Sequence, residues 1–397
     1  MEGTNSASST LSQPVAGPIP NTSDTWRSGP EVGIALCLSG GGYRAMLFHL
    51  GALYRLNELG FLPRLARVSS VSGGSIVAGL LGLRWGRLNF DGAGVAQDFS
   101  AEIVDPIRRF AGCTIDVPSV LGGMLTFASS GEHATDAYSR HLFHDATLQD
   151  LPDNPRFVIN ATNAQSGALW RFMKPYMRDY KVGEVRNPEV KLAKAVAASA
   201  AFPPVLAPIR LKLKHDSYSP PEDETLHRPP FTTNVFLVDG GVYDNLGLET
   251  AWKRYETILV SDGGGTLDAL ADPKADWLRQ TGRVIALIEN QVRSLRKRQL
   301  IGSFQRKGSS EDGARSGAYW GISTDIANYD LADSLEAPVN KTAALAKVPI
   351  RLKRLSSKTQ ERLINWGYAV CDAAMRKHVD QGASPPQGFP YPAEGVG

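Results

Sequence analysis

Short apolar runs alternate with helical patterns along residues 31–380, and this alternation restricts the fold more than any other feature of the chain. The runs are continuous rather than alternating in polarity, which is typical of strands that are buried on both faces of a sheet. The strand candidates are residues 32–38, 66–71, 156–161, 235–238, 257–260 and 283–288. Helical patterns cover residues 43–59 and 76–83, and Ser357 with Gln360 predicts a capping box for a helix that reaches His378. We therefore predict an α/β fold with a mostly parallel central sheet and helices on both faces.

The two ends of the chain differ in composition from the part between them. Residues 1–30 are rich in Ser, Thr, Pro and Gly, and they lack the basic start and apolar run of a secretory signal. Residues 381–397 carry four prolines among glycines. We predict that both ends are disordered tails and that residues 31–380 form one domain. Within this domain, residues 89–130 and 215–234 carry no catalytic signature and are candidates either for a cap over the site or for ordinary surface loops.

Charge and cysteine content exclude several classes of protein. Lys and Arg total 43 and Asp and Glu total 40, which is too even a balance to predict nucleic-acid binding. Cys37, Cys113 and Cys371 are too few and too scattered for a disulfide framework or a zinc site, which favours a reducing, cytoplasmic compartment. No apolar run approaches the ~18–20 residues that a membrane span needs.

The first motif is Ser-Gly-Gly-Gly-Tyr-Arg-Ala at residues 39–45, between a predicted strand and a predicted helix. The backbone N–H groups of Gly40, Gly41 and Gly42 could face an anion or a developing oxyanion at the helix N-terminus. The same residues also match the G-x-G-x-x-A pattern of dinucleotide binding, which needs an acidic residue at the tip of the next strand. Glu58 has a suitable separation but lies in the helical stretch. An oxyanion site, a dinucleotide site and a structural turn all remain open from this motif alone.

The second motif is Ser-Val-Ser-Gly-Gly at residues 70–74, where the next predicted strand ends. In a nucleophile elbow, a serine sits on a sharp turn from strand to helix, and the positions two before and two after it must be small. Ser72 meets this requirement with Gly74, whereas Ser70 stands where the usual pattern has glycine. The alternative is a Ser/Gly-rich loop without catalytic function.

The third motif places a carboxylate at the end of an apolar strand. Asp239 follows residues 235–238 and is followed by two glycines, and Asp262 ends a second strand in the same way. A carboxylate at this end of a strand lies at the edge of the sheet where ligands bind in α/β proteins, although Asp-Gly is also an ordinary turn. Acyl transfer needs a nucleophile, a base and oxyanion donors, and the three motifs offer all three groups at strand ends.

With these motifs and the block Ala-Ala-Ser-Ala-Ala-Phe-Pro-Pro at residues 197–204, the chain resembles the patatin-like phospholipase family of serine–aspartate lipid acyl hydrolases. The similarity runs from about residue 32 to residue 249 and implies a three-layer α/β/α fold. It implies that Ser72 is the nucleophile and Asp239 its base. It further implies that Gly40, Gly41 and Gly42 form the oxyanion hole, and the supporting residues are Arg44 and Gly73. The Asn245 that follows Asp239 matches the family pattern, which makes Asp262 structural.

The resemblance also sets expectations for substrate, cofactor and location. It implies a phospholipase A or lysophospholipase type of enzyme that cleaves carboxylic esters through an acyl-serine intermediate, with no metal and no organic cofactor. The substrate is a lipid at a membrane interface, and the protein is expected to be cytoplasmic with peripheral membrane contact. An aspartate with a pKa of ~3.9 is a weak base toward an alcohol, so this mechanism requires that Asp239 be buried.

Other assignments compete with this one. A Ser–Asp–His triad would use His378, which the pattern places at a solvent-facing helix end, and His141 with His144 lacks a third metal ligand at suitable spacing. A lipid-binding scaffold without turnover and a dinucleotide-binding protein that uses Gly40 and Gly42 are the alternative functions. Residues 292–307 are strongly basic with interleaved apolar positions, which fits either an amphipathic element on anionic lipid or a solvated helix face.

Overall fold

The computed structural model describes residues 30–115, 127–202, 208–221, 226–265, 267–273, 276–306 and 313–397. The strands are β1 (Glu31–Leu38), β2 (Leu65–Val71), β3 (Arg156–Asn163), β4 (Leu169–Phe172), β5 (Tyr176–Asp179), β6 (Gly183–Arg186), β7 (Ile209–Lys212), β8 (Tyr218–Ser219), β9 (Asn234–Asp239), β10 (Tyr255–Asp262) and β11 (Ser316–Gly321). The helices are α1 (Gly42–Glu58), α2 (Gly73–Arg84), α3 (Asp105–Ala111), α4 (Phe127–Tyr138), α5 (Leu192–Ser199), α6 (Gly241–Asp244), α7 (Glu249–Trp252), α8 (Trp277–Gln305), α9 (Val339–Ala346) and α10 (Ser357–His378). The tail expected at residues 1–30 lies, except for its last residue, outside the described residues.

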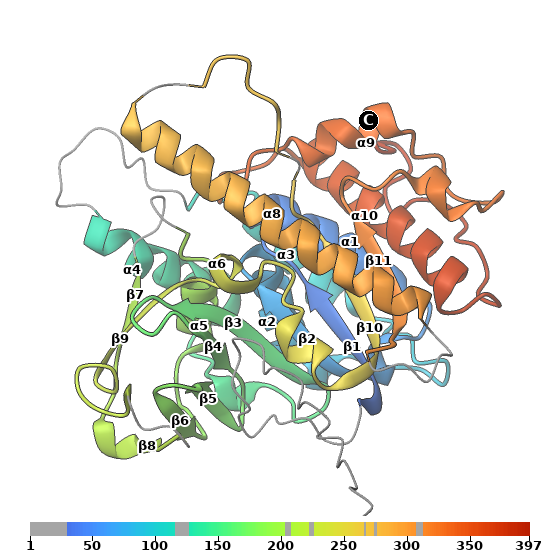
Figure 1. Cartoon of the computed structure of the whole chain (residues 1–397). Helices are drawn as coiled ribbons and strands as arrows, with labels where there is room; N and C mark the ends of the chain where they lie inside the picture. Colours follow the sequence, from blue (N-terminus) through green and yellow to red (C-terminus); the bar gives the residue numbers. More distant parts are fainter. Residues whose placement is uncertain are drawn as a thin grey trace, which may run out of the picture.

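The described strands form one mixed sheet of 11 strands. The order is β11-β10-β1-β2-β3-β4-β5-β6-β8, and β9 pairs with β3 and β7. The neighbours from β11 to β3 run parallel, whereas the pairs from β3 onward to β8, and those that involve β9, are antiparallel. Figure 1 shows the parallel strands at the centre of the molecule and the short antiparallel strands at one side. The predicted α/β fold with a mostly parallel central sheet is therefore confirmed.

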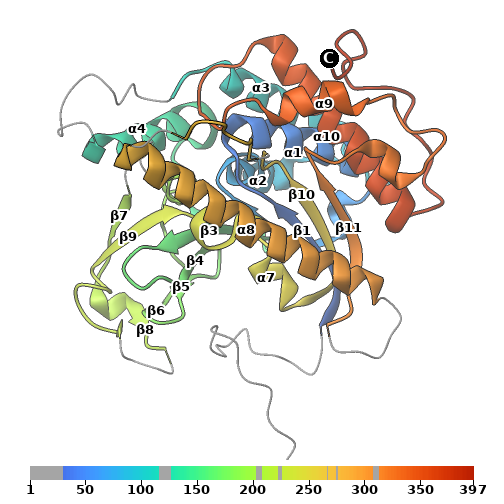
Figure 2. The ribbon, with the colours of Figure 1, turned by 45° about the horizontal axis from the view of Figure 1, so that its top comes forward.

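Both faces of the parallel strands are covered, as their continuous apolar sequences predict. Successive side chains of a strand point to opposite faces, so Leu36 and Leu38 of β1 join the larger core with α1, α2 and α10. Ala35 and Cys37 point the other way and join a smaller core with α7 and Leu300 of α8. Figure 2 shows the two groups of helices on either side of the strands.

The prediction of a strand at residues 283–288 is wrong, because these residues lie inside the 29-residue helix α8. The run is apolar and partly β-branched, but a window of six residues does not distinguish a strand from one face of a helix. The Asp276 side chain caps this helix by accepting a hydrogen bond from the Arg279 N–H, 3.0 Å away. The last helix also starts differently from the prediction, since Ser356 and not Ser357 is the N-cap and accepts from the Thr359 N–H.

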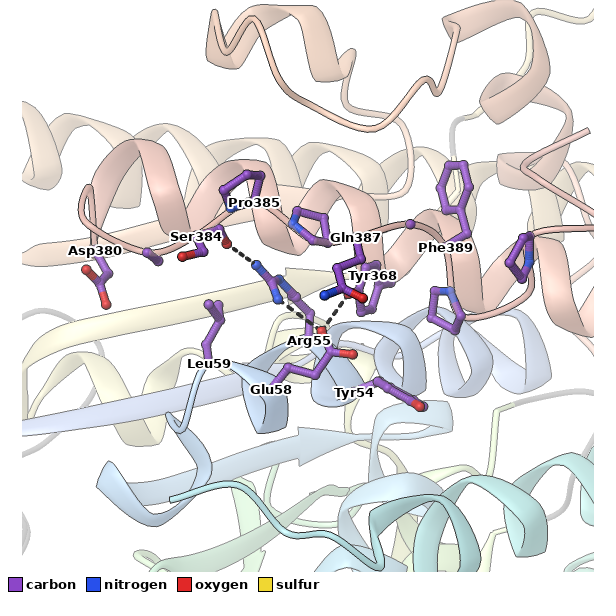
Figure 3. Close-up of a pocket in the computed structure, with 15 residues that line it drawn as sticks. Tyr54, Arg55, Glu58, Leu59, Tyr368, Asp380, Ser384, Pro385, Gln387 and Phe389 are labelled. Atoms are coloured by element: carbon purple, nitrogen blue, oxygen red, sulfur yellow. Dashed lines mark hydrogen bonds and ion pairs between the residues drawn. The ribbon is translucent and has the colours of Figure 1, made fainter. Parts of the chain in front are cut away.

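The structure differs from the expectation that residues 381–397 are disordered. This segment packs against α1 and α10, and Val396 is only 3% exposed. The Asn365 side chain donates to the carbonyls of Tyr391 and Gly395 at 2.8 and 2.7 Å. Figure 3 shows Ser384 over Arg55 of α1, whose guanidinium donates to the Ser384 carbonyl at 2.7 Å. The proline-rich segment therefore forms an ordered strap beside a cavity of about 690 Å³. Side chains of α1 and α10 hold its backbone carbonyls by hydrogen bonds, which composition does not reveal.

Within the described ranges, no helix is long and apolar enough to cross a membrane.

Candidate active site

Ser72 lies on a sharp turn between β2 and α2. Its backbone has φ 51° and ψ −118°, a conformation that a residue with a Cβ rarely adopts. Such strain is found where the surrounding structure holds a functional side chain in place, as in a nucleophile elbow. A Cβ at Gly74 would lie 2.4 Å from the Leu38 carbonyl oxygen, so only glycine fits two residues after the serine. The turn therefore has the geometry that the sequence motif predicts.

Hydrogen bonds from neighbouring elements hold this strained turn. Ser199 at the end of α5 accepts a hydrogen bond from the Ser72 N–H at 2.9 Å and donates to the Asn160 carbonyl of β3 at 2.6 Å. Ser70, which replaces the usual glycine, directs its hydroxyl to the Val158 carbonyl at 3.3 Å and also lies 3.0 Å from the Ser75 hydroxyl. The extra hydroxyl is therefore accommodated by hydrogen bonds beneath the elbow and leaves its geometry intact.

Asp239 ends β9, and sheet pairing brings it to Ser72. Asp239 pairs with Ala161 of β3, the strand next to β2. The Ser72 side chain lies close enough to the Asp239 carboxylate to lower the pKa of that carboxyl group. The Gly241 N–H donates to Asp239 Oδ1 at 2.7 Å. Asp239 is only 3% exposed, and this burial raises the pKa of its carboxyl group to about 7, although Gly241 and Ser72 both act to lower it.

The glycine loop lies beside the same serine. A Cβ at Gly40 would lie 3.2 Å from the Ser72 Cβ, and Gly42 has a φ of +59° with no room for a side chain against the Arg351 backbone. The Gly40 N–H already donates to Asn245, to its carbonyl oxygen at 3.0 Å and to its Oδ1 at 3.1 Å. The N–H groups of Gly41 and Gly42, by contrast, have no acceptor among the described residues. Of the three predicted oxyanion donors, two are therefore available at the N-terminus of α1.

The two supporting residues from the sequence both contact backbone around the loop. A Cβ at Gly73 would lie 2.2 Å from the Gly42 carbonyl oxygen, so the elbow and the glycine loop are packed directly together. The buried Arg44 side chain donates to the carbonyls of Gly263, Ala346 and Val348 at 2.8–3.1 Å. Arg44 thus joins the start of α1 to two chain segments on the far side of the loop.

A cavity of about 610 Å³ contains Ser72, Asp239 and the glycine loop. Its walls combine this polar end with apolar side chains, among them Phe202, Leu267, Ile285, Ile350 and Leu352. A volume of this size with a few convergent polar groups is typical of a small-molecule or lipid site. Residues 89–130 and 215–234, the two predicted cap candidates, contribute no lining residue within their described parts.

Helix α8, and not either of the two cap candidates, lines the cavity, and no sequence motif predicted this. Glu289 and Arg293 of α8 line the cavity, and the Glu289 carboxylate accepts a hydrogen bond from Asn245 Nδ2 at 2.8 Å. Burial raises the pKa of Glu289. A signal was present in the sequence, since Glu289 is the single acidic residue in a helix with six Lys and Arg residues.

The competing residues lie outside the cavity. The Asp262 carboxylate is occupied by the Gly264 N–H at 2.9 Å and the Tyr319 hydroxyl at 2.8 Å. Glu58 binds Arg55 at the other end of α1, and His378 packs its ring against Tyr329. Among the lining residues in the described part of the chain there is no histidine, and no cluster of three potential metal ligands occurs in that part. The triad and dinucleotide alternatives therefore have no geometric support.

Comparison with known families gives a match to the model for patatin-like phospholipases over residues 36–252, more than half of the chain. The chain belongs to the patatin-like phospholipase family. The matched range contains the glycine loop, the elbow and Asp239, which is consistent with a lipid hydrolase. A search of curated protein sequences found no match.

Two solved structures are similar to this chain at low sequence identity. Human GIVD cytosolic phospholipase A2 has a TM-score of 0.50 and 15% identity, with 87% of this chain and 59% of that chain covered. VipD from Legionella pneumophila has a TM-score of 0.34 and 15% identity, with 87% of this chain and 67% of that chain covered. The chain thus spans 59% of the length of the human enzyme, and the likeness to it concerns the α/β fold.

Ser199→Ala is expected to slow turnover without abolishing it. The substitution removes the acceptor for the Ser72 N–H and leaves the Asn160 carbonyl without its donor. One hydrogen bond is worth about 1–1.5 kcal/mol, which corresponds to roughly a tenfold decrease in kcat. Initial rates on a chromogenic ester measure this, with the exposed Ser217→Ala as control. An unchanged rate in Ser199→Ala would show that the elbow does not depend on α5.

Proposed function

We propose that the protein is a lipid acyl hydrolase of the phospholipase A or lysophospholipase type, with Ser72 as nucleophile and Asp239 as base. The observation that carries this proposal is the placement of the strained Ser72 beside the buried Asp239 carboxylate, inside a cavity that is also lined by Gly41 and Gly42 with their unoccupied N–H groups. Membership of a phospholipase family supports an acyl ester as the substrate.

Acylation follows from this geometry. Ser72 Oγ attacks the carbonyl carbon of the ester, and its proton passes to the Asp239 carboxylate. The carbonyl oxygen becomes negatively charged and accepts hydrogen bonds from the N–H groups of Gly41 and Gly42 at the N-terminus of α1. The intermediate then collapses, the bond to the leaving alcohol breaks, and the alcohol takes the proton from Asp239.

Deacylation repeats these steps with water. Asp239 accepts a proton from a water molecule as its oxygen attacks the acyl-Ser72 carbonyl, and the proton is then returned to Ser72 Oγ as the fatty acid leaves. The raised pKa of Asp239 makes this carboxylate a far better base than one in water, because burial disfavours its charged form. Apart from the substrate and water, these steps use only groups of the chain.

The cavity favours an ester with a long acyl chain. Phe202, Ile285 and Leu352 line the same cavity as Ser72 and provide apolar contacts for an acyl chain. We therefore propose glycerophospholipids and lysophospholipids as the substrate class. Product analysis on a panel of lipids tests this, with wild type beside Ser72→Ala. Release of fatty acid by the wild type alone is expected, and release by neither protein would leave a lipid-binding scaffold as the function.

The rate is expected to depend on pH through Asp239. The base must be deprotonated, and its pKa is about 7, so activity should be low in acid and reach a plateau above this pH. Below the pKa, kcat/KM should fall about tenfold for each pH unit. A pH–rate profile on a monomeric ester, corrected with Ser72→Ala, measures this. A profile that stays flat down to the range of ordinary carboxyl groups would contradict a buried base.

A further inference from the structure

The face of α8 that points away from the protein carries exposed apolar side chains. Trp277, Val284, Ile288 and Leu295 are 76%, 47%, 59% and 57% exposed. Their spacings of seven, four and seven residues place all of them on one side of a helix. At 1.5 Å per residue this stripe is about 27 Å long. In both Figure 1 and Figure 2, α8 is drawn in front of the other elements, so the stripe lies along an open side of the molecule.

The stripe is continuous with the mouth of the active-site cavity. Ile285 lines the cavity and is nevertheless 46% exposed, and it follows Val284 of the stripe. Ile350, on the other wall, is 58% exposed and also lines the cavity. An acyl chain that enters between these two side chains therefore passes beside the apolar stripe.

The charges of α8 indicate what the stripe contacts. The helix carries six basic residues and one acidic residue. Glu289 is turned inward to Asn245, so it does not place a negative charge on the outward face. Arg298 is exposed, and Arg279 is exposed as well but pairs with Asp276 at 3.6 Å, whereas Arg293 pairs with Asp262 in the interior. An exposed apolar stripe with basic flanks fits the headgroup region of an anionic bilayer.

We propose that the outward face of α8, from Trp277 to Leu295, is the surface that docks on an anionic phospholipid membrane and aligns the cavity mouth with it. This inference rests on the proposed lipid hydrolase function, because it explains how an acyl chain reaches Ser72. Of the two alternatives for residues 292–307, an amphipathic element on lipid or a solvated helix face, it favours the first but places it nearer the N-terminus, since the exposed apolar residues of the stripe lie at positions 277–295.

The test measures binding to vesicles of equal parts phosphatidylglycerol and phosphatidylcholine in a Ser72→Ala background, so that the lipid is not hydrolysed. The triple variant Val284→Gln, Ile288→Gln, Leu295→Gln is expected to bind these vesicles about a hundredfold more weakly, because three apolar side chains no longer enter the membrane. The matched control is Val32→Gln with Val339→Gln, two valines that are 89% and 49% exposed on β1 and α9. With Ser72 intact, both sets should hydrolyse a monomeric short-chain ester at the wild-type rate.

The outcomes separate this proposal from the function it rests on. Equal vesicle binding by the triple variant and the control would overturn the docking surface, whatever the hydrolase activity. Equal affinity for vesicles of phosphatidylcholine alone would overturn the role of the basic flank. A change in oligomeric state with unchanged vesicle binding would show that the stripe joins two copies of the chain. Failure to hydrolyse any ester, with vesicle binding lost only in the triple variant, would reject the enzyme and keep the surface.

A second measurement does not depend on the folding of the triple variant. Trp277 is 76% exposed at the start of α8, and its fluorescence should shift to the blue when vesicles are added. This shift should be absent in Trp277→Phe. A shift of equal size in Trp277→Phe would show that another tryptophan meets the membrane and would overturn the proposal.

Discussion

Alanine in place of Ser72 is expected to abolish covalent labelling by a fluorophosphonate and to reduce ester hydrolysis by about 10⁴-fold or more, as for other serine nucleophiles. In the proposed mechanism this hydroxyl oxygen forms the bond to the acyl carbon, and the neighbouring hydroxyls of Ser75 and Ser199 bind each other beneath the elbow at 2.9 Å. Neither can replace it. Labelling followed by mass spectrometry and initial rates on a monomeric ester together measure the effect.

The control for Ser72→Ala is Ser217→Ala, which removes an exposed hydroxyl from the loop before β8. It should label and turn over like the wild type. Persistent labelling of Ser72→Ala would place the nucleophile elsewhere in the chain. The substitution should leave the backbone strain at φ 51° unchanged, because alanine also has a Cβ.

Asp239→Asn is expected to eliminate activity and at the same time to stabilise the protein at pH 8. The folded state raises the pKa of Asp239 from 3.8 to about 7, so it binds the proton more tightly than the unfolded chain does. The contribution of this group to stability is therefore present below the unfolded pKa and is lost as the pH rises toward 7. Above that pH the buried charge costs roughly 4 kcal/mol at most, at about 1.4 kcal/mol per pKa unit.

Asparagine preserves the oxygen that accepts from the Gly241 N–H and removes the charge, so thermal unfolding at pH 8 should occur at a higher temperature. The gain should vanish at pH 4, where Asp239 itself is protonated. Scanning calorimetry at both values measures this. A lower unfolding temperature at pH 8 would mean that the carboxylate is stabilised in the folded protein and would contradict a desolvated base.

Asp262→Asn is the matched comparison, because Asp262 ends β10 and, like Asp239, is followed by two glycines. It should retain most of the activity, since Asp262 does not line the cavity. It should lower the unfolding temperature, because it weakens the ion pair with Arg293 at 3.8 Å. The two substitutions are thus expected to shift stability in opposite directions.

The strands with continuous apolar runs were predictable, including the antiparallel β9, whereas the parallel β11 and the short antiparallel strands were not. β1, β2 and β10 are long apolar runs because both of their faces are buried, and this pattern is visible in the sequence. Strands such as β6 (Gly183–Arg186) have four residues with mixed polarity, and they form only because a neighbour already offers an unpaired edge. The C-terminal strap was missed for a related reason, since its order depends on Asn365 in another element.

Some features of the site were likewise predictable from the sequence, and others were not. Ser72 and Asp239 could be proposed from the sequence because each stands at a strand end with glycine beside it, and both line the same cavity. The sequence could not predict that the Gly40 N–H donates to Asn245, because the three glycines of the run look equivalent. The contribution of α8 was hard to predict, because its approach to the cavity depends on tertiary packing and its one local signal is the single acidic residue Glu289 in a basic helix.

One side chain connects the inward face of α8 to the glycine loop. Asn245 donates from Nδ2 to Glu289 and accepts at Oδ1 from the Gly40 N–H, so a helix whose outer side is proposed to meet the membrane is joined through one amide to the loop beside Ser72. Displacing α8 would break or remake these contacts. Binding at the two places is then energetically coupled, and such coupling is reciprocal. A transition-state analogue on Ser72 should change the affinity for vesicles by the same factor as vesicles change the affinity for the analogue.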